Sequence, residues 1–227
     1  MIDIVNKILK VFDENHLWDE GIELVGSWCF LLYTKHFDVK SYPFRTIDID
    51  FLVPNPFKGK KKVDIIKLIE KLGYRVAFNS DGSIYLWNPE LKVEFITAEK
   101  GRGSEKAIEI KNLSLKAIPL RYTDILLADP VSIIEDGINV RIPNPAAFAL
   151  HKLLISAKRK TTEKKAKDIE QALLVLDAIN MEDVVKIHSG FPVPWKKSII
   201  KTLKKSEKEL FLYKRIIQKT ILTLQSL

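Results

Sequence analysis

The sequence has a single cysteine and no long apolar run. Cys29 stands alone among 227 residues, which excludes an intrachain disulfide and a zinc site built from several cysteines. It lies within the apolar run WCFLLY, so we expect a small core residue. No apolar stretch reaches the roughly 18 to 20 residues that a membrane-spanning helix needs, and the N-terminus is an amphipathic pattern that contains acids. We therefore expect a soluble, cytoplasmic protein with no membrane partner.

Histidine is scarce as well, and the 4 histidines stand far apart in the sequence. No second histidine or cysteine lies at metal-ligand spacing from His151, so we expect a structural role for this residue. His16, His36 and His188 are isolated and carry no predicted role. The sequence therefore indicates no imidazole-based metal site.

Charge is plentiful, but it is unevenly placed. The net charge is +8; residues 146–227 contain 17 Lys or Arg and 8 Asp or Glu, whereas residues 1–145 contain 20 and 21. A basic excess confined to the last third is compatible with a polyanionic partner such as RNA, DNA or the phosphate tail of a nucleotide. Lysine-rich helices with solvated outer faces and the Lys and Glu enrichment of thermophile proteins produce the same pattern without a ligand.

Hydrophobic periodicity divides the chain into a mixed part and an all-helical part. In the first part we expect helices over 2–18, 28–37 and 63–72, the second of them capped by Ser27, and strands over 23–25, 47–53, 74–78, 83–87, 91–97 and 138–142. In the second part we expect helices over 146–158, introduced by Pro143 and Pro145, and over 163–179, 181–189 and 195–224. The fold class is therefore α+β, with a mixed part over residues 1–145 and a helical part over residues 146–227.

Two carboxylates alternate with apolar residues in the stretch RTIDIDFLV, residues 45–53. In a strand, Asp48 and Asp50 project from one face, while Ile47 and Ile49 project from the other and anchor the strand in the core. Two close, partly buried carboxylates repel each other unless a cation neutralises them. Mg²⁺ is the usual oxygen-liganded ion where phosphate chemistry is involved.

A third acid, Glu94, lies in the apolar stretch LKVEFI and belongs beside the pair if the two strands are neighbours. Three carboxylates are what a two-metal phosphoryl-transfer centre requires, so we expect two Mg²⁺ or Mn²⁺ ions held by Asp48, Asp50 and Glu94. The alternative for Glu94 is a strand carboxylate paired with Lys92 or Arg75.

Upstream, Gly26 and Ser27 mark a turn from a strand into a helix. Glycine allows a close backbone approach, and a helix N-terminus offers free N–H groups to phosphate oxygens. This turn, the Asp-x-Asp strand and the third acid together resemble the DNA polymerase β-like nucleotidyltransferase superfamily. RTIDIDFLV is most similar to the Arg-x-Thr-x-Asp-x-Asp element of the abortive-infection, toxin-type nucleotidyltransferases and of the uncharacterised bacterial and archaeal nucleotidyltransferases near them.

The resemblance extends into the helical part and covers roughly residues 22–175. Lys152, in HKLLISAKR, and Asp168, which follows Lys167, resemble the helix Lys and the Lys-Asp or Arg-Asp element of this group. Twenty residues separate Ser27 from Asp48, more than in minimal members, and we expect the extra length to form a loop at 38–44. The resemblance implies that residues 1–145 form a nucleotidyltransferase catalytic core, a mixed sheet with flanking helices. It implies that residues 146–227 form a helical bundle that closes the nucleotide cleft.

The implied activity is metal-dependent transfer of a nucleoside monophosphate from an NTP to an acceptor hydroxyl, with release of pyrophosphate. Asp48 and Asp50 would hold both ions, and Glu94 would complete the shell of the catalytic ion and assist deprotonation of the acceptor. Gly26 and Ser27 would hold the β and γ phosphates. RNA, tRNA, a protein and a small molecule are all open as acceptors, and the base of the NTP and the oligomeric state stay open too.

Basic residues would then neutralise the leaving pyrophosphate. Lys152 is the first candidate, supported by Arg45 or Arg159; Arg45 serves equally well to hold Asp48 or Asp50 in place. The alternatives without a role in catalysis are a Lys152 exposed to solvent and an Asp168 in a surface ion pair with a neighbouring helix lysine.

Two other functions are weighed against this one. The first is an inactive nucleotidyltransferase-fold module that binds RNA or a protein partner, as in a toxin-antitoxin-like system; three mutually repelling acids argue against it. The second is a metal-dependent nuclease, which usually adds a lysine two residues after its last acid, where this chain has Ile96.

Overall fold

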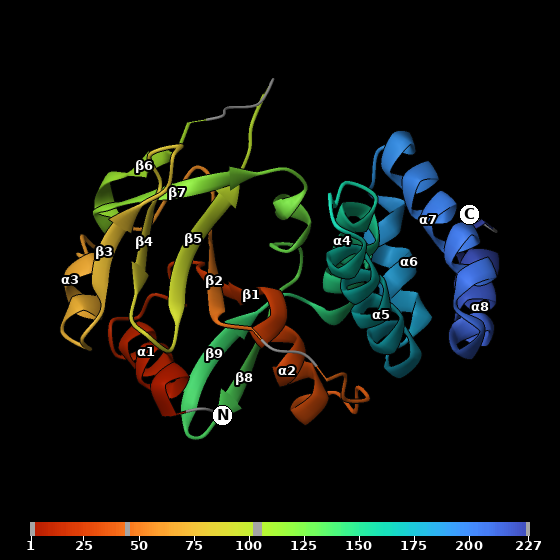
Figure 1. Cartoon of the computed structure of the whole chain (residues 1–227), viewed down its shortest axis with the longest axis horizontal. Helices are drawn as coiled ribbons and strands as arrows, with labels where there is room; N and C mark the ends of the chain where they lie inside the picture. The colour runs from red at the N-terminus through yellow and green to blue at the C-terminus, as the bar shows by residue number, and fades with distance from the viewer. Residues whose placement is uncertain (1–2, 44–45, 102–105, 226–227) are drawn as a thin grey trace. The chain divides into compact units, whose positions relative to one another are not determined.

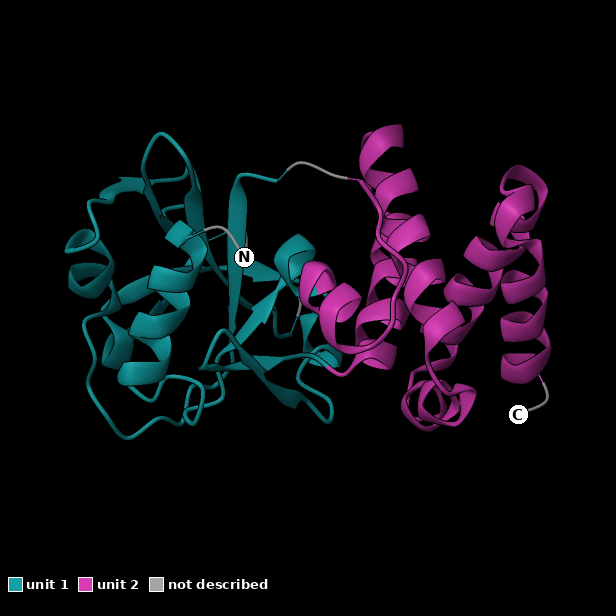
Figure 2. Cartoon of the chain, turned by 90° about the horizontal axis from the view of Figure 1, so that it is seen from below, with its two compact units in different colours: residues 1–29, 44–143 teal, residues 30–43, 144–227 magenta. Residues whose placement is uncertain are grey.

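The computed structural model describes residues 3–43, 46–101 and 106–225. By their internal contacts these residues form two compact units: unit 1 comprises residues 1–29 and 44–143, and unit 2 comprises residues 30–43 and 144–227 (Figure 2). Helix α2 (Gly26–His36) begins in unit 1 and ends in unit 2. The functional division into a catalytic core over 1–145 and a helical domain over 146–227 stays a prediction. Within the described residues, no helix is long and apolar enough to cross a membrane.

Unit 1 is built on a mixed sheet of 7 strands (Figure 1). Its strands are β1 (Glu23–Val25), β2 (Asp48–Val53), β3 (Arg75–Phe78), β4 (Ile84–Trp87), β5 (Lys92–Ala98), β6 (Ile108–Ile110) and β7 (Leu115–Leu120). The order is β1-β2-β5-β4-β3, with β7 paired to β5 and β6 paired to β7. The β2–β5 and β5–β7 pairs are parallel and the other pairs are antiparallel. The predicted α+β class with a mixed sheet is confirmed.

One face of this sheet is apolar and carries the main core of unit 1. Helix α1 (Asp3–Glu14) packs on it, and the Phe12 ring stacks on the Phe51 ring of β2 with 4.0 Å between centroids. Phe51 stacks in turn on Phe95 of β5. Helix α3 (Ile65–Glu70), capped by the Asp64 side chain, contacts α1, β3 and β4. The opposite face of β2 and β5 is therefore left for the acids.

A short hairpin completes unit 1. Strands β8 (Val131–Glu135) and β9 (Ile138–Ile142) pair antiparallel through a turn at Asp136 and Gly137, both with positive φ, which suits a two-residue hairpin turn. Strand β9 contacts α1 and β1. Unit 1 also contains the 3₁₀ helices η1 (Lys111–Leu113) and η2 (Thr123–Ile125).

Unit 2 is helical. Its elements are α4 (Pro145–Ser156), α5 (Thr162–Ala178), α6 (Met181–Ser189), α7 (Val193–Glu209), the 3₁₀ helix η3 (Phe211–Tyr213) and α8 (Lys214–Gln225). Helix α4 is buried over nearly its whole length and contacts α5, α6 and α7. The rings of Tyr33 and Phe30, from the second part of α2, lie against Phe148 of α4. Side chains of Asn144, Thr161 and Asn180 cap α4, α5 and α6.

Three local predictions were wrong. The expected helix over 195–224 breaks at Leu210, whose φ of −120° and ψ of 73° end α7 so that α8 packs back on it. Ser27 does not cap α2, because the helix already begins at Gly26 and Ser27 lies inside its first turn. Ile47 does not anchor a strand, since β2 begins at Asp48 and the Ile47 side chain is 66% exposed. The loop expected at 38–44 is present over the described residues 37–43, which form neither helix nor strand.

Candidate functional site

The three predicted acids lie on one face of the sheet in unit 1. Parallel pairing of β2 with β5 places Asp50 beside Glu94, and Asp48 beside Lys92. Neighbours across a parallel pair point to the same face, so all four side chains share it. Each of these four residues is half-buried, whereas Ile49, which lies between the two Asp residues, is buried. The alternation read from the sequence is thus present in the strand.

Lys92 is bound to one of the acids. Its Nζ donates to Glu94 Oε1 at 2.7 Å and lies 4.4 Å from the centroid of the Tyr85 ring. Both side chains are mostly buried, with 29% of Lys92 and 18% of Glu94 exposed. Burial lowers the pKa of Lys92, but the hydrogen bond and charge of Glu94 outweigh it and raise the pKa above its ordinary value. The Glu94–Lys92 pair that the sequence offered as an alternative is present.

The donor set suits a hard divalent cation, because carboxylate oxygens on adjacent strands are the ligands that Mg²⁺ and Mn²⁺ prefer. In the conformation described, however, no three His, Cys, Asp or Glu side chains of the described residues are gathered closely enough to hold an ion. Lys92 provides the positive charge on this face instead. The chemistry of the site therefore fits a metal, and Lys92 offsets part of the negative charge on this face.

Gly26 lies directly against Asp50. Antiparallel pairing places Val25 opposite Asp50, and a Cβ on Gly26 would come within 2.5 Å of Asp50 Oδ2. Gly26 also has φ of +75°, which disfavours any other residue. Glycine is thus required at this position for two reasons, the close approach to Asp50 and the positive φ. The turn also brings the start of α2 next to the acidic face. Ser27 follows in the first turn of α2 and is half-buried.

A buried acid of β1, Glu23, was missed by sequence reasoning. Its side chain is fully buried, and Oε1 accepts from Arg141 Nε at 3.3 Å, while Oε2 has no hydrogen-bond partner among the described residues. Burial raises the pKa of Glu23 to about 7, against the opposing effect of Arg141. Arg141 belongs to β9, 118 residues further along the chain, so no local pattern indicates this pair.

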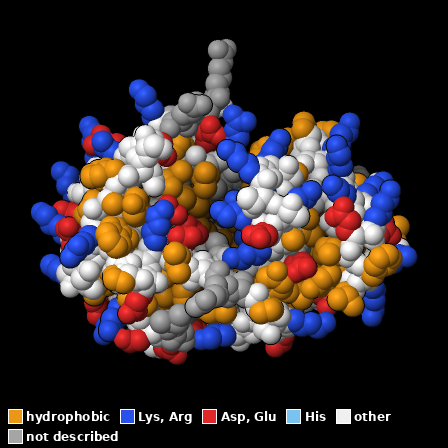
Figure 3. Space-filling model, in the orientation of Figure 1, with side chains coloured by type: hydrophobic (Ala, Val, Ile, Leu, Met, Phe, Trp, Pro, Cys, Tyr) orange, Lys and Arg blue, Asp and Glu red, His pale blue; other side chains and the backbone are white. Residues whose placement is uncertain are grey.

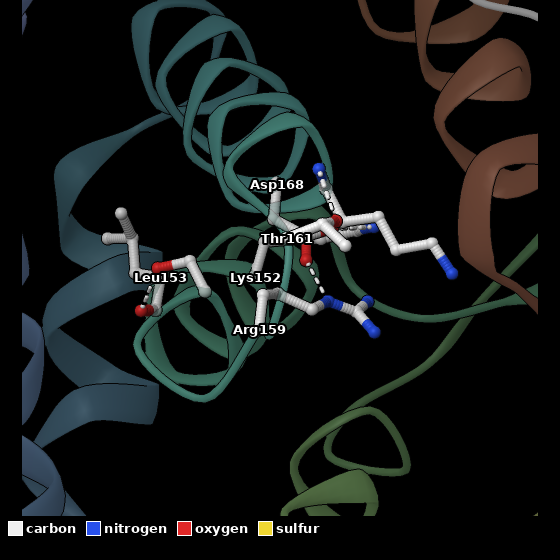
Figure 4. Close-up of polar contacts among 7 residues, drawn as sticks. Lys152, Leu153, Arg159, Thr161 and Asp168 are labelled. Atoms are coloured by element: carbon white, nitrogen blue, oxygen red, sulfur yellow. Dashed lines mark hydrogen bonds and ion pairs between the residues drawn. The ribbon is translucent and has the colours of Figure 1, made fainter.

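The basic residues predicted in the helical part form one cluster in unit 2. Lys152 Nζ of α4 lies 2.7 Å from Asp168 Oδ1 of α5, and Arg159 Nε lies 2.5 Å from Asp168 Oδ2 (Figure 4). Lys152 and Asp168 are 7% and 3% exposed and Arg159 is 38% exposed. Burial raises the pKa of Asp168, but Lys152 and Arg159 outweigh it and hold the pKa below its usual value. A solvated Lys152 and a surface-exposed Asp168 are therefore both excluded.

His151 is adjacent to this cluster in the sequence and is buried, which is consistent with the expected structural role. Burial, followed by the positive charge of Lys152, lowers the pKa of His151 to about 3, so the imidazole is neutral at physiological pH. The remaining predicted site residue, Arg45, lies outside the described residues, and both of its predicted roles stay predictions.

The structure thus assembles two groups, each within its own unit. The first comprises Gly26, Ser27, Asp48, Asp50 and Glu94, to which Lys92 is added. The second comprises Lys152, Arg159 and Asp168. The position of Lys92 could have been predicted from the sequence. Lys92 stands two residues before Glu94, and residues two apart in a strand point to the same face.

Comparison with known proteins gives one family and several similar structures. A sequence model described as nucleotidyltransferase matches residues 3–188. An antigenic nucleotidyltransferase-like protein from Paracoccidioides brasiliensis is similar with a TM-score of 0.50 and 11% identity, over 93% of this chain and 91% of that chain. At that identity the likeness supports the fold alone.

Two structures of ANT(2'')-Ia are also similar. The solution structure, described as an antibiotic-resistance factor, has a TM-score of 0.47 and 16% identity, over 91% of this chain and 96% of that chain. The crystal structure with adenylyl-2''-tobramycin has a TM-score of 0.45 and 16% identity, over 81% of this chain and 91% of that chain. A search of curated protein sequences finds no significant match.

Proposed function

Because this chain belongs to the nucleotidyltransferase family, whose sequence pattern spans residues 3–188, we propose that it transfers a nucleoside monophosphate from an NTP to an acceptor hydroxyl and releases pyrophosphate. The observation that carries the proposal is the register of β2 and β5. It places Asp48, Asp50 and Glu94 on one face, beside the Gly26 turn. An acid trio next to a helix start that offers free N–H groups is suited to phosphoryl transfer.

In this proposal Asp48, Asp50 and Glu94 hold Mg²⁺ or Mn²⁺. When bound, such ions activate the acceptor hydroxyl and stabilise charge on the leaving pyrophosphate. Gly26 and Ser27 offer backbone N–H groups at the start of α2 to the β and γ phosphates, an arrangement that the positive end of the helix dipole favours.

Lys92 has a role that the sequence did not suggest. Its ammonium group lies 2.7 Å from Glu94 and offsets the charge of one of the three carboxylates. Glu94 can ligate a cation fully only after Lys92 Nζ has left its Oε1. We propose that Lys92 reduces the repulsion among the acids and would compete with a metal ion for Glu94.

In unit 2, Arg159 is better placed than Lys152 to meet a phosphate. Lys152 is almost fully buried and bound to Asp168. Arg159 is more exposed and binds Asp168 through Nε, while its two terminal nitrogens point away from the carboxylate (Figure 4). We propose that Arg159 contacts the triphosphate and that Lys152 and Asp168 position it. A planar guanidinium suits phosphate oxygens.

The alternative function is an inactive nucleotidyltransferase-fold module that binds RNA or a protein partner, as in a toxin-antitoxin-like system. One observation favours it: the Lys92–Glu94 ion pair satisfies one of the three acids without a metal. The acids of this face do not indicate the acceptor. RNA, tRNA, a protein and a small molecule are all compatible with the proposal. A cytoplasmic location is proposed with the activity, since NTPs are its substrates.

Labelled nucleotides test the proposal. The purified protein is incubated with Mg²⁺ or Mn²⁺, each NTP in turn, and total RNA or cell lysate as acceptor. We expect label from the α-phosphate in the acceptor and label from the γ-phosphate in pyrophosphate. Label from the γ-phosphate in the acceptor would identify a kinase and overturn the proposal, and no transfer from any NTP would favour the inactive module.

A further inference from the structure

Unit 2 contains a concave pocket lined mainly by lysines. It has a volume of about 380 Å³ and lies among the end of α4, α5 and α7. Its lysines are Lys158, Lys165, Lys201 and Lys205. Lysine and arginine side chains are conspicuous over α7 and α8 on the face drawn in Figure 3. The buried Ile169 of α5 also lines the pocket.

The positive charge of this pocket is poorly neutralised. Glu209 is the one acid lining the pocket, and its Oε1 lies 3.8 Å from Lys205 Nζ. Among the described residues, Lys158, Lys165 and Lys201 have no ion-pair partner. Ammonium groups gathered in a concavity repel one another, and the repulsion is relieved when an anion binds among them.

Hydroxyl donors stand beside the lysines. Ser198, Thr202 and Ser206 of α7 line the same pocket. The Ser206 hydroxyl donates to the Thr202 carbonyl at 2.9 Å, whereas the Ser198 and Thr202 hydroxyls make no hydrogen bond within the described part of the chain. Ammonium groups together with free hydroxyls are a donor set suited to phosphate oxygens, each of which accepts several hydrogen bonds.

One wall of the pocket lies outside the family match, whereas Lys158 and Lys165 lie inside it. One wall is α7 (Val193–Glu209), which lies beyond residue 188, where the family match ends. None of its four lysines belongs to the acidic face or to the Lys152 cluster. The concentration of lysines is therefore separate from the residues that the proposed transfer reaction uses.

We propose that this pocket binds a phosphate-rich anion, that is, a run of adjacent phosphate groups carried by a free polyphosphate or by the backbone of RNA. Four ammonium groups on two sides of one concavity match several neighbouring phosphates better than a single small anion. Binding would screen the lysine repulsion and hold the end of α4, α5 and α7 together, so it would also stabilise unit 2.

The test compares two double variants of the full chain with equal loss of charge. Lys165→Met with Lys201→Met removes one pocket lysine from α5 and one from α7. Lys164→Met with Lys208→Met removes one lysine from each of the same helices outside the pocket. All four side chains are exposed or half-exposed, so both variants should fold like the wild type, which thermal unfolding without ligand checks.

Calorimetry with tripolyphosphate and with a short single-stranded RNA gives the readout. We expect the pocket variant to bind at least one of them roughly tenfold more weakly than the wild type, a factor that corresponds to about 1.4 kcal/mol. The control variant should change by less than about twofold, as expected for screened surface charges. Replacement of the same pocket residues by arginine should restore binding.

The ligand that shows this selective loss identifies the source of the phosphates: tripolyphosphate alone indicates a free polyphosphate, and RNA indicates a nucleic-acid backbone. Equal weakening in the pocket and control variants would mean a general charge effect and overturn the proposal. Absence of binding of both ligands to the wild type would overturn it as well. Neither result bears on nucleotidyl transfer, which depends on the acids of unit 1.

Discussion

Single residues determine how three carboxylates coexist on one face of the sheet. Asp50 lies beside Glu94 and under the Gly26 turn, while Lys92 reaches Glu94 from the same strand. Removal of any one of these residues should alter the balance of charge in a specific direction. Lys92→Met tests this balance, and Glu23→Gln tests the separate buried acid of β1.

Lys92→Met should strengthen metal binding. The substitution removes the ammonium group that competes for Glu94 while keeping a long apolar stem against Tyr85. We expect Mn²⁺, titrated alone and followed by calorimetry, to bind roughly threefold to tenfold more tightly than to the wild type, which corresponds to about 0.7 to 1.4 kcal/mol. Lys62→Met, which removes an exposed lysine in the same unit, is the matched control and should leave the affinity unchanged.

Weaker Mn²⁺ binding in Lys92→Met would show that the lysine supports the metal site and does not compete with it. Lys92→Arg, which keeps the charge, should bind Mn²⁺ like the wild type. If Asp48→Asn with Asp50→Asn binds Mn²⁺ as well as the wild type does, the acids are not the ligands.

Glu23→Gln should flatten the pH dependence of stability. The pKa of Glu23 rises from its ordinary value of 4.5 to about 7 in the fold, because the carboxyl is buried. Between these two values the folded protein keeps a proton that the unfolded chain has released. The stabilisation is therefore complete below about pH 4.5 and is lost as the pH rises through 7, by up to about 3 kcal/mol.

Urea unfolding at pH 5, 6, 7 and 8 measures this effect. The free energy of unfolding of the wild type should fall over this range by more than that of Glu23→Gln, whose neutral amide does not titrate. Parallel curves for the two proteins would show that Glu23 is ionised in the fold across the whole range.

At the scale of elements, the β2–β5 register was predictable and the pairing of distant residues was not. The period-two pattern of β2 fixes which side chains share a face, and the Gly-Ser turn is local to a few residues. The Glu23–Arg141 and Lys152–Asp168 pairs depend on how strands and helices pack. No glycine or proline at the break near Leu210 marks the end of α7 in the sequence. The break accompanies the packing of α8 against α7.

Gly26→Ala should disrupt the turn between β1 and α2. The new Cβ would lie within 2.5 Å of Asp50 Oδ2, and the residue would hold an unfavourable φ of +75°. Gly73→Ala is the matched control, because Gly73 has φ of +89° but no atom within 4 Å of its Cβ position. Backbone strain of about 1 to 2 kcal/mol is expected in both variants, and displacement of Asp50 only in the first.

The measurement is Mn²⁺ affinity together with urea unfolding. Gly26→Ala should lose both stability and metal affinity, and Gly73→Ala only stability. Equal metal affinity in both variants would show that the close approach of Gly26 to Asp50 does not matter to the site.

Asp168→Ala should destabilise the pairing of α4 with α5 strongly. It would leave Lys152, which is 7% exposed, as a buried charge without its partner. We expect a loss of about 3 to 5 kcal/mol in the free energy of unfolding. Glu209→Ala, which removes one partner of the exposed Lys205–Glu209 pair, should cost under about 1 kcal/mol. A loss for Asp168→Ala no larger than that of Glu209→Ala would mean that Lys152 finds solvent without its partner.

For the whole molecule, the sequence was sufficient to predict a mixed sheet followed by helices, and family membership agrees with it. It did not predict that residues 30–43 belong with the C-terminal helices, because the contacts that join them, such as those of the α2 rings with Phe148 and of Lys40 with Asp177, are between residues far apart in the sequence. Nor did it separate the basic excess of residues 146–227 into a buried Lys152 cluster and a lysine-lined pocket. Both distinctions depend on three-dimensional packing.

The central claim is that Asp48 and Asp50 carry out nucleotidyl transfer with Glu94. The most direct measurement is pyrophosphate released from NTP by the wild type and by Asp48→Asn with Asp50→Asn, at equal protein concentration with Mg²⁺. We predict release that matches label transfer in the wild type and a loss of at least about 100-fold in the double variant, because oxygen ligands of catalytic ions are removed. Undiminished release by a folded double variant would contradict the account.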